Sequence, residues 1–194
     1  MLCLFEGVAT GAADGYGRMA RRPAAALLHL GPGLANGLAN LHNARRARTP
    51  LLTVVGDHAT YHKRFDAPLE SDIEPLAGSV SGWVRRSLRS ADVAADAAEA
   101  VAAAMRPPGA ISTLILPADV SWSEGASPAA PLPVRAPAPV PQASIESVAG
   151  TLRSGEPCVL LLGGAGARRP GDPVTPGAVG RLFRPARPRR SHPP

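Results

Sequence analysis

Glu6 is the first residue of this chain whose position suggests chemistry. It follows the apolar residues Met1–Phe5 and opens the helical pattern of residues 6–22. A carboxylate at the start of a helix is stabilised by the helix dipole, whereas in an apolar site it would be kept neutral and ready to exchange a proton. An acid in a first helical turn also suits a capping role without chemistry. Both interpretations stay open on the residue alone.

A second candidate is the glycine-rich segment Gly31–Gly37, which His29 precedes. Its glycines resemble a dinucleotide-binding fingerprint whose third glycine comes one residue late, and Asp57, about 24 residues after Gly33, would suit a ribose-binding acid. The alternative is a tight strand-to-helix turn that needs glycine for backbone reasons. His29 is either a proton-transfer group or a histidine satisfied inside the sheet.

Two further clusters carry weaker signals. His58 and His62, with Asp57 and Asp66 nearby, have spacing compatible with a metal site, but nothing in this polar run fixes a ligand number or geometry. We therefore predict no metal site in this chain. Residues 163–166 follow a strand-like run and could hold a phosphate, yet no helical pattern follows them.

The elements that must position these residues alternate between strand and helix. Strands that are apolar throughout, separated by helices, predict an α/β fold with a parallel sheet and helices on both faces. Functional groups then gather at the carboxyl ends of the strands. Residues 56–75 are polar and are expected to form a loop. The expected strands are Leu2–Phe5, Ala24–Leu30, Leu51–Val55 and Ile111–Leu116, and the expected helices are 6–22, 34–47 and Ala91–Met105.

Composition divides the chain into four parts. We expect a first domain over residues 1–122 and a proline-rich linker over 123–143, where residues 126–143 hold six prolines. Residues 144–167 would begin a second α/β domain, with a helix at Ser144–Arg153 and a strand at Cys158–Leu162. Residues 168–194 lack apolar periodicity and are predicted to be a disordered basic tail.

Charge and composition exclude several function classes. The net charge is +6, but residues 168–194, with seven arginines and one acid, account for all of it. The remainder is neutral and only 4% of residues are aromatic, so we predict no nucleic-acid partner. No apolar run reaches membrane-spanning length, so no membrane association is expected. Two cysteines, Cys3 and Cys158, suit neither a disulfide framework nor a zinc site and favour a cytoplasmic location.

Taken together, four segments resemble one family of enzymes. The helix with the pattern E-x-x-A-x-x-x-A-D-G-Y-A-R in thiamine-diphosphate enzymes is similar to Glu6–Arg18, and the turn G-P-G-x-x-N is similar to Gly31–Asn36. Thr49–Gly56 and Pro108–Val120 resemble the following strand and the closing strand of the same domain. The branch is that of acetolactate synthase, pyruvate oxidase and benzoylformate decarboxylase. The resemblance covers residues 1–122, where it implies the pyrimidine-binding domain.

The resemblance implies specific roles. It makes Glu6 the catalytic carboxyl that hydrogen-bonds N1′ of the aminopyrimidine and favours the imino tautomer, which takes the C2 proton of the thiazolium ring. His29 falls where benzoylformate decarboxylase has an active-site histidine. Besides Glu6, the implied cofactor-binding residues are Gly31, Pro32, Gly33 and Asn36.

The resemblance also implies partners: thiamine diphosphate with Mg²⁺, a 2-oxo acid substrate, and a homodimer or homotetramer, with FAD a possibility in full-length relatives. After Gly56 the synthases usually carry glutamine, whereas this chain has Asp57, so carboligase and decarboxylase both remain open. The Gly-Asp-Gly…Asn segment that holds Mg²⁺ in this family is absent, as are a strand and helix upstream of Glu6. We therefore expect this polypeptide alone to bind the cofactor poorly and to be inactive.

Two other functions remain as alternatives. One is a nicotinamide- or flavin-binding module built on the glycine segment and Asp57. The other is a non-catalytic interaction protein whose basic tail contacts acidic partners. Glu6 discriminates between the first alternative and the enzyme family, because only the enzyme family requires a carboxyl group there.

Overall fold

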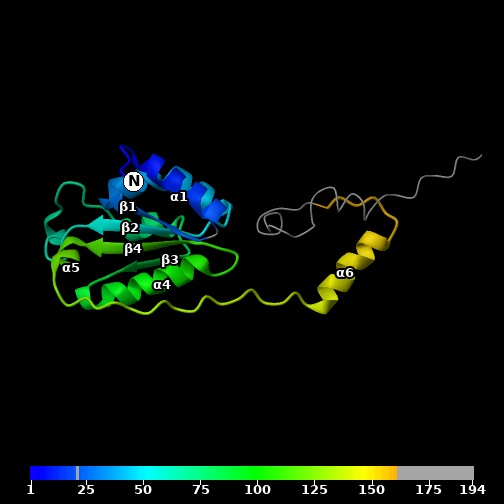
Figure 1. The fold of residues 1–194 in the computed structure, drawn as a ribbon. Helices are drawn as coiled ribbons and strands as arrows, with labels where there is room; N and C mark the ends of the chain where they lie inside the picture. Colours follow the sequence, from blue (N-terminus) through cyan, green and yellow to red (C-terminus); the bar gives the residue numbers. More distant parts are fainter. Residues whose placement is uncertain (21, 161–194) are drawn as a thin grey trace, which may run out of the picture. The chain divides into compact units, whose positions relative to one another are not determined.

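The computed structural model describes residues 1–20 and 22–160 (Figure 1). It divides into two compact units, Met1–Pro139 and Val140–Pro194. The first unit contains a four-stranded sheet in the order β1-β2-β4-β3, and every neighbouring pair is parallel. The predicted parallel α/β class is therefore confirmed. The strands are β1 Ala24–His29, β2 Leu51–Asp57, β3 Trp83–Arg86 and β4 Ile111–Pro117.

Helices lie on both sides of this sheet, as predicted. Helices α1 and α2 pack on each other and on β1 and β2, while α4 packs on β4, β3 and β2. Figure 1 shows α1 and α4 on opposite sides of the strands. The helices of the first unit are α1 Glu6–Ala20, α2 Leu30–Arg46, α3 Ile73–Gly78, α4 Val93–Met105 and α5 Ala118–Trp122, with short 3₁₀ turns at Lys63–Phe65 and Ser90–Asp92.

The core lies between the sheet and α2. The strand register puts Leu28, Val55 and Ile115 side by side on one row, and all three are buried. Leu34 and Leu41 of α2 are fully buried against the same face. Each such side chain contributes about 1.5–3 kcal/mol when it leaves water. This packing fixes where the first turn of α2 stands relative to the carboxyl ends of the strands.

The opposite face of β1 is open. Side chains alternate along a strand, so the residues between the buried ones point the other way, and Leu27 is 76% exposed. His29 shares that exposed face at the end of the strand. Strand β1 is at the edge of the sheet, and α4 packs on β2, β3 and β4 instead.

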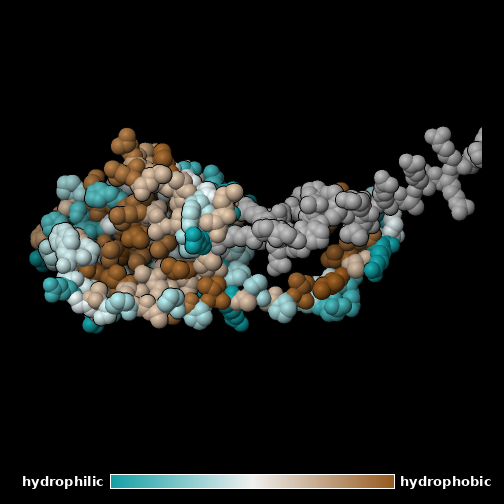
Figure 2. All heavy atoms as spheres, viewed as in Figure 1, coloured by the Kyte–Doolittle hydropathy of each residue, from teal (hydrophilic) through white to brown (hydrophobic). Residues whose placement is uncertain are grey.

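The strand predicted at Leu2–Phe5 is wrong. These residues form no strand, and Leu2 and Leu4 are almost fully exposed. Figure 2 shows apolar side chains gathered on the surface where the chain begins and α1 lies. An apolar run of four residues has no periodicity of its own, so it becomes a strand only where a neighbouring strand pairs with it.

Three elements were not predicted from the sequence. Strand β3 has four residues, two of them arginines, and among the described residues it pairs with β4 alone. Helix α3 begins inside the region expected to be a loop, and α5 is a single short turn after β4. Strand β2 also continues to Asp57, beyond the predicted end at Val55. Short edge elements depend on their neighbours more than on their own pattern.

The second unit has one helix in its described part, α6 Gln142–Arg153, where a helix was predicted from Ser144. Residues 158–160 form no strand, contrary to the prediction, while 161–162, the glycines of 163–166 and the predicted tail lie outside the described residues. Among residues 1–20 and 22–160, none of the helices combines the length and apolar character that crossing a membrane requires.

Candidate functional site

Small residues let α1 and α2 approach closely. The buried Thr10 hydroxyl lies 2.9 Å from the carbonyl oxygen of Glu6 and 3.3 Å from that of Gly37 on α2. A Cβ atom at Gly37 would lie 2.8 Å from the Thr10 methyl group, so only glycine allows this separation. The contact brings the first turn of α1 against the first turns of α2.

Two asparagines of α2 reach across to the start of α1. Asn40 donates a hydrogen bond of 2.6 Å from Nδ2 to the carbonyl oxygen of Gly7. Asn36 donates one of 3.1 Å from Nδ2 to Oε2 of Glu6. Residues four apart share one helix face, which explains why both amides meet α1. Asn40 was not predicted as a site residue, although its spacing from Asn36 carried that signal.

The two carboxylate oxygens of Glu6 differ in their surroundings: Asn36 donates a hydrogen bond to Oε2, whereas Oε1 lies beside Gly33. It is half-buried in the first turn of α1, where its carboxyl group also benefits from the helix N-terminus. Asn36 fixes Oε2, while a Cβ atom at position 33 would lie only 3.5 Å from Oε1. Gly33 therefore leaves space beside Oε1 that a side chain would fill.

The segment Gly31-Pro32-Gly33 is not the turn that the sequence predicted. It forms the first turn of α2, which begins at Leu30 with a φ of 57°. Proline is well tolerated there because the first N–H groups of a helix have no partner inside it. Gly31 is buried, and a Cβ atom there would overlap the side chain of Ser71. Pro32 is exposed on the same turn.

His29 stands beside this turn. It ends β1 and occupies the N-cap position of α2, where its side chain makes no capping hydrogen bond. A Cβ atom at Gly33 would lie 3.6 Å from the His29 Cβ atom and 3.5 Å from Glu6 Oε1. Gly33 thus lies between the histidine and the carboxyl group. The structure brings Glu6, His29, Gly33 and Asn36 together at the carboxyl end of β1.

Asp57, at the end of β2, belongs to a separate network of charges. It is 4% exposed, lies 3.2 Å from Lys63 Nζ and forms an ion pair with Arg86. Arg86 also pairs with Glu74 at 2.7 Å, and Lys63 pairs with Glu70. Burial lowers the pKa of Arg86, and the hydrogen bond from Lys63 lowers the pKa of the Glu70 carboxyl.

This network disfavours a dinucleotide site. A ribose-binding acid must offer its oxygens to a ligand, whereas those of Asp57 are taken up by Arg86, Lys63 and the backbone N–H of His58. Two of the three glycines of the fingerprint, Gly31 and Gly37, pack against Ser71 and Thr10 inside the protein. His58 lies 3.2 Å from the carbonyl oxygen of Pro68. The network therefore anchors the loop after β2.

A comparison with protein families identifies this domain. Residues 1–76 match the model described as "Thiamine pyrophosphate enzyme, N-terminal TPP binding domain". Residues 1–76 are therefore similar to the N-terminal domain of thiamine pyrophosphate enzymes. The matched segment contains α1, β1, α2 and β2, and with them every predicted site residue. The resemblance noted in the sequence is confirmed.

Relatives of the thiamine pyrophosphate domain agree with this assignment. A protein of Mycobacterium tuberculosis named "Putative acetolactate synthase large subunit IlvX" is 67% identical over 88% of this chain. Benzoylformate decarboxylase of Pseudomonas aeruginosa is 31% identical over 65% of it. The chain spans about a third of the first relative and a quarter of the second, 33% and 24% of their lengths.

A solved structure shows the same fold. It is described as a "putative thiamin diphosphate-dependent enzyme" from Mycobacterium smegmatis, and it superposes with a TM-score of 0.68 at 30% identity. The match covers 78% of this chain and 29% of that one. The α/β architecture described above is therefore that of a thiamine-diphosphate enzyme domain.

Proposed function

We propose that the first unit holds the aminopyrimidine ring of thiamine diphosphate, with Glu6 as the carboxyl group that shares a proton with ring nitrogen N1′. The observation that carries this proposal is the pairing of Glu6 with Asn36 at 3.1 Å, which orients the carboxyl group while Gly33 leaves space beside its other oxygen. The family match over residues 1–76 supplies the cofactor class.

The residues present fit one part of the cofactor. Glu6 offers an oxygen to a ring nitrogen, and Gly33 keeps a side chain away from the space beside that oxygen. Mg²⁺ needs several oxygen ligands beside the diphosphate, and the Gly-Asp-Gly sequence that supplies them in this family does not occur in these 194 residues. We infer that the diphosphate and Mg²⁺ are held by another polypeptide or domain.

The proposed reaction class is the conversion of a 2-oxo acid. When bound, thiamine diphosphate supplies an electron sink for the carbanion that forms as CO₂ leaves. In this chain, Glu6 would hold the proton at N1′, Asn36 would orient Glu6, and His29 would exchange a proton with the substrate or orient it. The relatives include an acetolactate synthase and a decarboxylase by name, and the proposal covers both.

We also propose that the working enzyme is an oligomer. Apolar residues of α1 are exposed, from Val8 near Glu6 to Met19 at the far end of the helix. A second chain over that surface would enclose the ring and exclude water, which strengthens a carboxyl–nitrogen hydrogen bond.

The test uses the isolated aminopyrimidine, 4-amino-5-hydroxymethyl-2-methylpyrimidine, as a probe of the full chain. Ligand-observed NMR should show line broadening with the wild type that Glu6→Gln reduces and Glu6→Ala abolishes. Tyr61→Ala, an exposed change in the loop after β2, serves as the control and should leave the broadening unchanged. Equal broadening with wild type and Glu6→Ala, or none with the wild type, would overturn the role of Glu6.

A second measurement separates the ring from the diphosphate. Isothermal titration of the 194-residue chain with thiamine diphosphate and Mg²⁺ should give weak binding, because the charged diphosphate finds no metal-binding segment here. Micromolar affinity would contradict this expectation. It would also show that the described residues hold more of the cofactor than the ring.

A further inference from the structure

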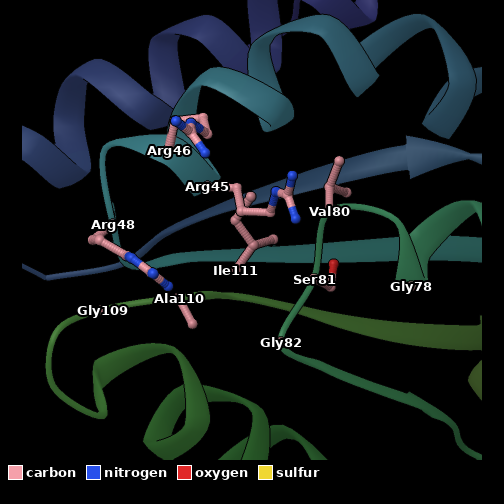
Figure 3. Close-up of a pocket in the computed structure, with 10 residues that line it drawn as sticks. All are labelled: Arg45, Arg46, Arg48, Gly78, Val80, Ser81, Gly82, Gly109, Ala110 and Ile111. Carbon is pink, nitrogen blue, oxygen red and sulfur yellow. The ribbon is translucent and has the colours of Figure 1, made fainter.

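The end of the sheet opposite Glu6 carries a hollow of about 500 Å³. It lies where β2, β3 and β4 begin, between the last turn of α2 and the segments that lead into β3 and β4 (Figure 3). Three arginines line it together with apolar Val80 and Ile111: Arg45 and Arg46 at the end of α2, and Arg48 just after the helix. The family match to a cofactor-binding domain assigns nothing to this end of the strands.

The charge around this hollow is of one sign. The segments 45–50, 78–82 and 105–110 contain four arginines and neither aspartate nor glutamate. Within the described part of the chain, none of the eight ion pairs involves Arg45, Arg46 or Arg48. The helix dipole places about half a negative charge at the C-terminus of α2, which offsets only part of the positive charge of these arginines. The hollow therefore keeps an excess positive charge.

One of these arginines has an unusual backbone conformation beside the hollow. Arg48 has a φ of 55°, an unusual conformation for a residue with a side chain. Its carbonyl oxygen would overlap a Cβ atom at Gly109, which has a φ of 111°. The segments that lead into β2 and β4 therefore lie close together at this point. Figure 3 shows the Arg48 side chain extending toward Ala110, and Arg45 reaching toward Val80 from the other side.

We propose that this hollow binds a small anion that carries a diphosphate group. Guanidinium groups present several N–H donors in a planar fork that matches phosphate oxygens, and pockets for small ligands span roughly 300–1,000 Å³. The diphosphate belongs either to free pyrophosphate or to a nucleoside diphosphate. Strand β2, with seven residues, separates this site from the Glu6 end by about 20 Å.

The binding test is isothermal titration of the full chain with three probes: pyrophosphate, adenosine diphosphate and adenosine. Both phosphate probes should bind and adenosine should not. Affinity should fall as NaCl is raised, because the attraction is ionic. Equal affinity for pyrophosphate and adenosine diphosphate identifies the diphosphate group alone as the ligand. If adenosine diphosphate binds about tenfold tighter than pyrophosphate, the ligand is a nucleotide. Absence of binding by either phosphate at low salt would overturn the proposal.

A matched pair of variants at Gly78 locates the site without removing an arginine. A Cβ atom at Gly78 meets nothing within 4 Å, so Gly78→Glu and Gly78→Gln both fit and differ only in charge. Glutamate at the rim should weaken pyrophosphate binding about tenfold relative to glutamine. Arg48→Gln should weaken it similarly, while Arg89→Gln, an exposed arginine at the other end of the sheet, should change it less than about twofold. Equal effects of the two Gly78 variants would refute the site.

One further variant separates this site from the proposed cofactor site. Glu6→Gln should leave pyrophosphate binding unchanged, since Glu6 lies at the opposite ends of the strands. Loss of pyrophosphate binding in Glu6→Gln would overturn the proposal made here. The aminopyrimidine experiment fails or succeeds independently, because that probe carries no phosphate.

Discussion

The two ends of the sheet hold charge in opposite ways. At the carboxyl end, Asp57 is buried and pairs with Arg86 and Lys63, and these bases also pair with Glu74 and Glu70. At the amino end, three arginines surround a hollow, and no ion pair within the described residues includes them. Both ends are built from loops between the same strands.

The difference shows which charges are structural. A buried pair cannot lose one partner without leaving an unpaired charge in the interior, so it fixes the loop in one arrangement. Exposed arginines without partners contribute little to stability and remain free to meet an anion. Stability measurements therefore report mainly on the buried charges at the carboxyl end, whereas measurements of anion binding report on the arginines at the amino end.

The largest expected effect comes from removing the buried acid. Asp57→Ala leaves Arg86 without its most buried partner, and we expect the free energy of unfolding to fall by about 3 kcal/mol. Urea denaturation followed by circular dichroism measures the change. The matched charge removal at the other end, Arg48→Gln, should change stability by less than about 0.5 kcal/mol. Similar losses for both variants would break the contrast between the two ends.

The next effect concerns the contact that brings α1 to α2. Gly37→Ala places a methyl group 2.8 Å from the Thr10 methyl, and it should cost about 1–3 kcal/mol of unfolding free energy. Gly15→Ala is the control, because a Cβ atom there meets nothing within 4 Å. That change should stabilise the protein by about 0.5–1 kcal/mol through helix propensity. If Gly37→Ala were neutral, close helix packing would not position Glu6.

A smaller effect is expected from pH at the carboxyl end. Lys63 lowers the folded-state pKa of Glu70 below its ordinary value of 4.5. This stabilisation is fully present above the unfolded-state pKa and is lost as pH falls through the folded-state pKa. The melting temperature of the wild type should therefore drop more between about pH 6 and about pH 3 than that of Glu70→Gln. Parallel curves for the two proteins would show that the Lys63–Glu70 pair contributes nothing.

The smallest effect is expected from the arginines of the hollow. Arg45→Gln relieves repulsion between neighbouring cations and should stabilise the protein by less than about 0.5 kcal/mol. Added NaCl should remove the difference from the wild type because it screens exposed charges. Thermal melts at low and high salt measure both points. A clear loss of stability in Arg45→Gln at low salt would indicate an attractive partner for this arginine.

Local patterns predicted the central elements well. The apolar runs that became β1, β2 and β4, and the periodic segments that became α1, α2 and α4, appear close to their expected bounds. Each is long enough for its own side chains to show one periodicity. Strand β3 escaped prediction because two of its four residues are arginines, and only pairing with β4 makes it a strand.

The candidate site was predicted residue by residue, but its geometry was not. The resemblance selected Glu6, His29 and Asn36, and the structure brings these three together around Gly33. The alternative dinucleotide hypothesis required Asp57 to be available to a ligand. Its partner Arg86 lies 29 residues further along the chain, and no spacing rule connects the two.

The sequence by itself determined the α/β class, the family and the identity of the candidate residues, since periodicity and motifs are local properties. Only the tertiary structure decided that Gly37 serves helix packing, that Asp57 is buried in a charge network, and that three arginines at and just after the end of α2 share a hollow with the starts of β3 and β4. These outcomes depend on which distant segments the folded chain brings within a few ångströms of each other. Burial and electrostatic interactions take their strength from that arrangement.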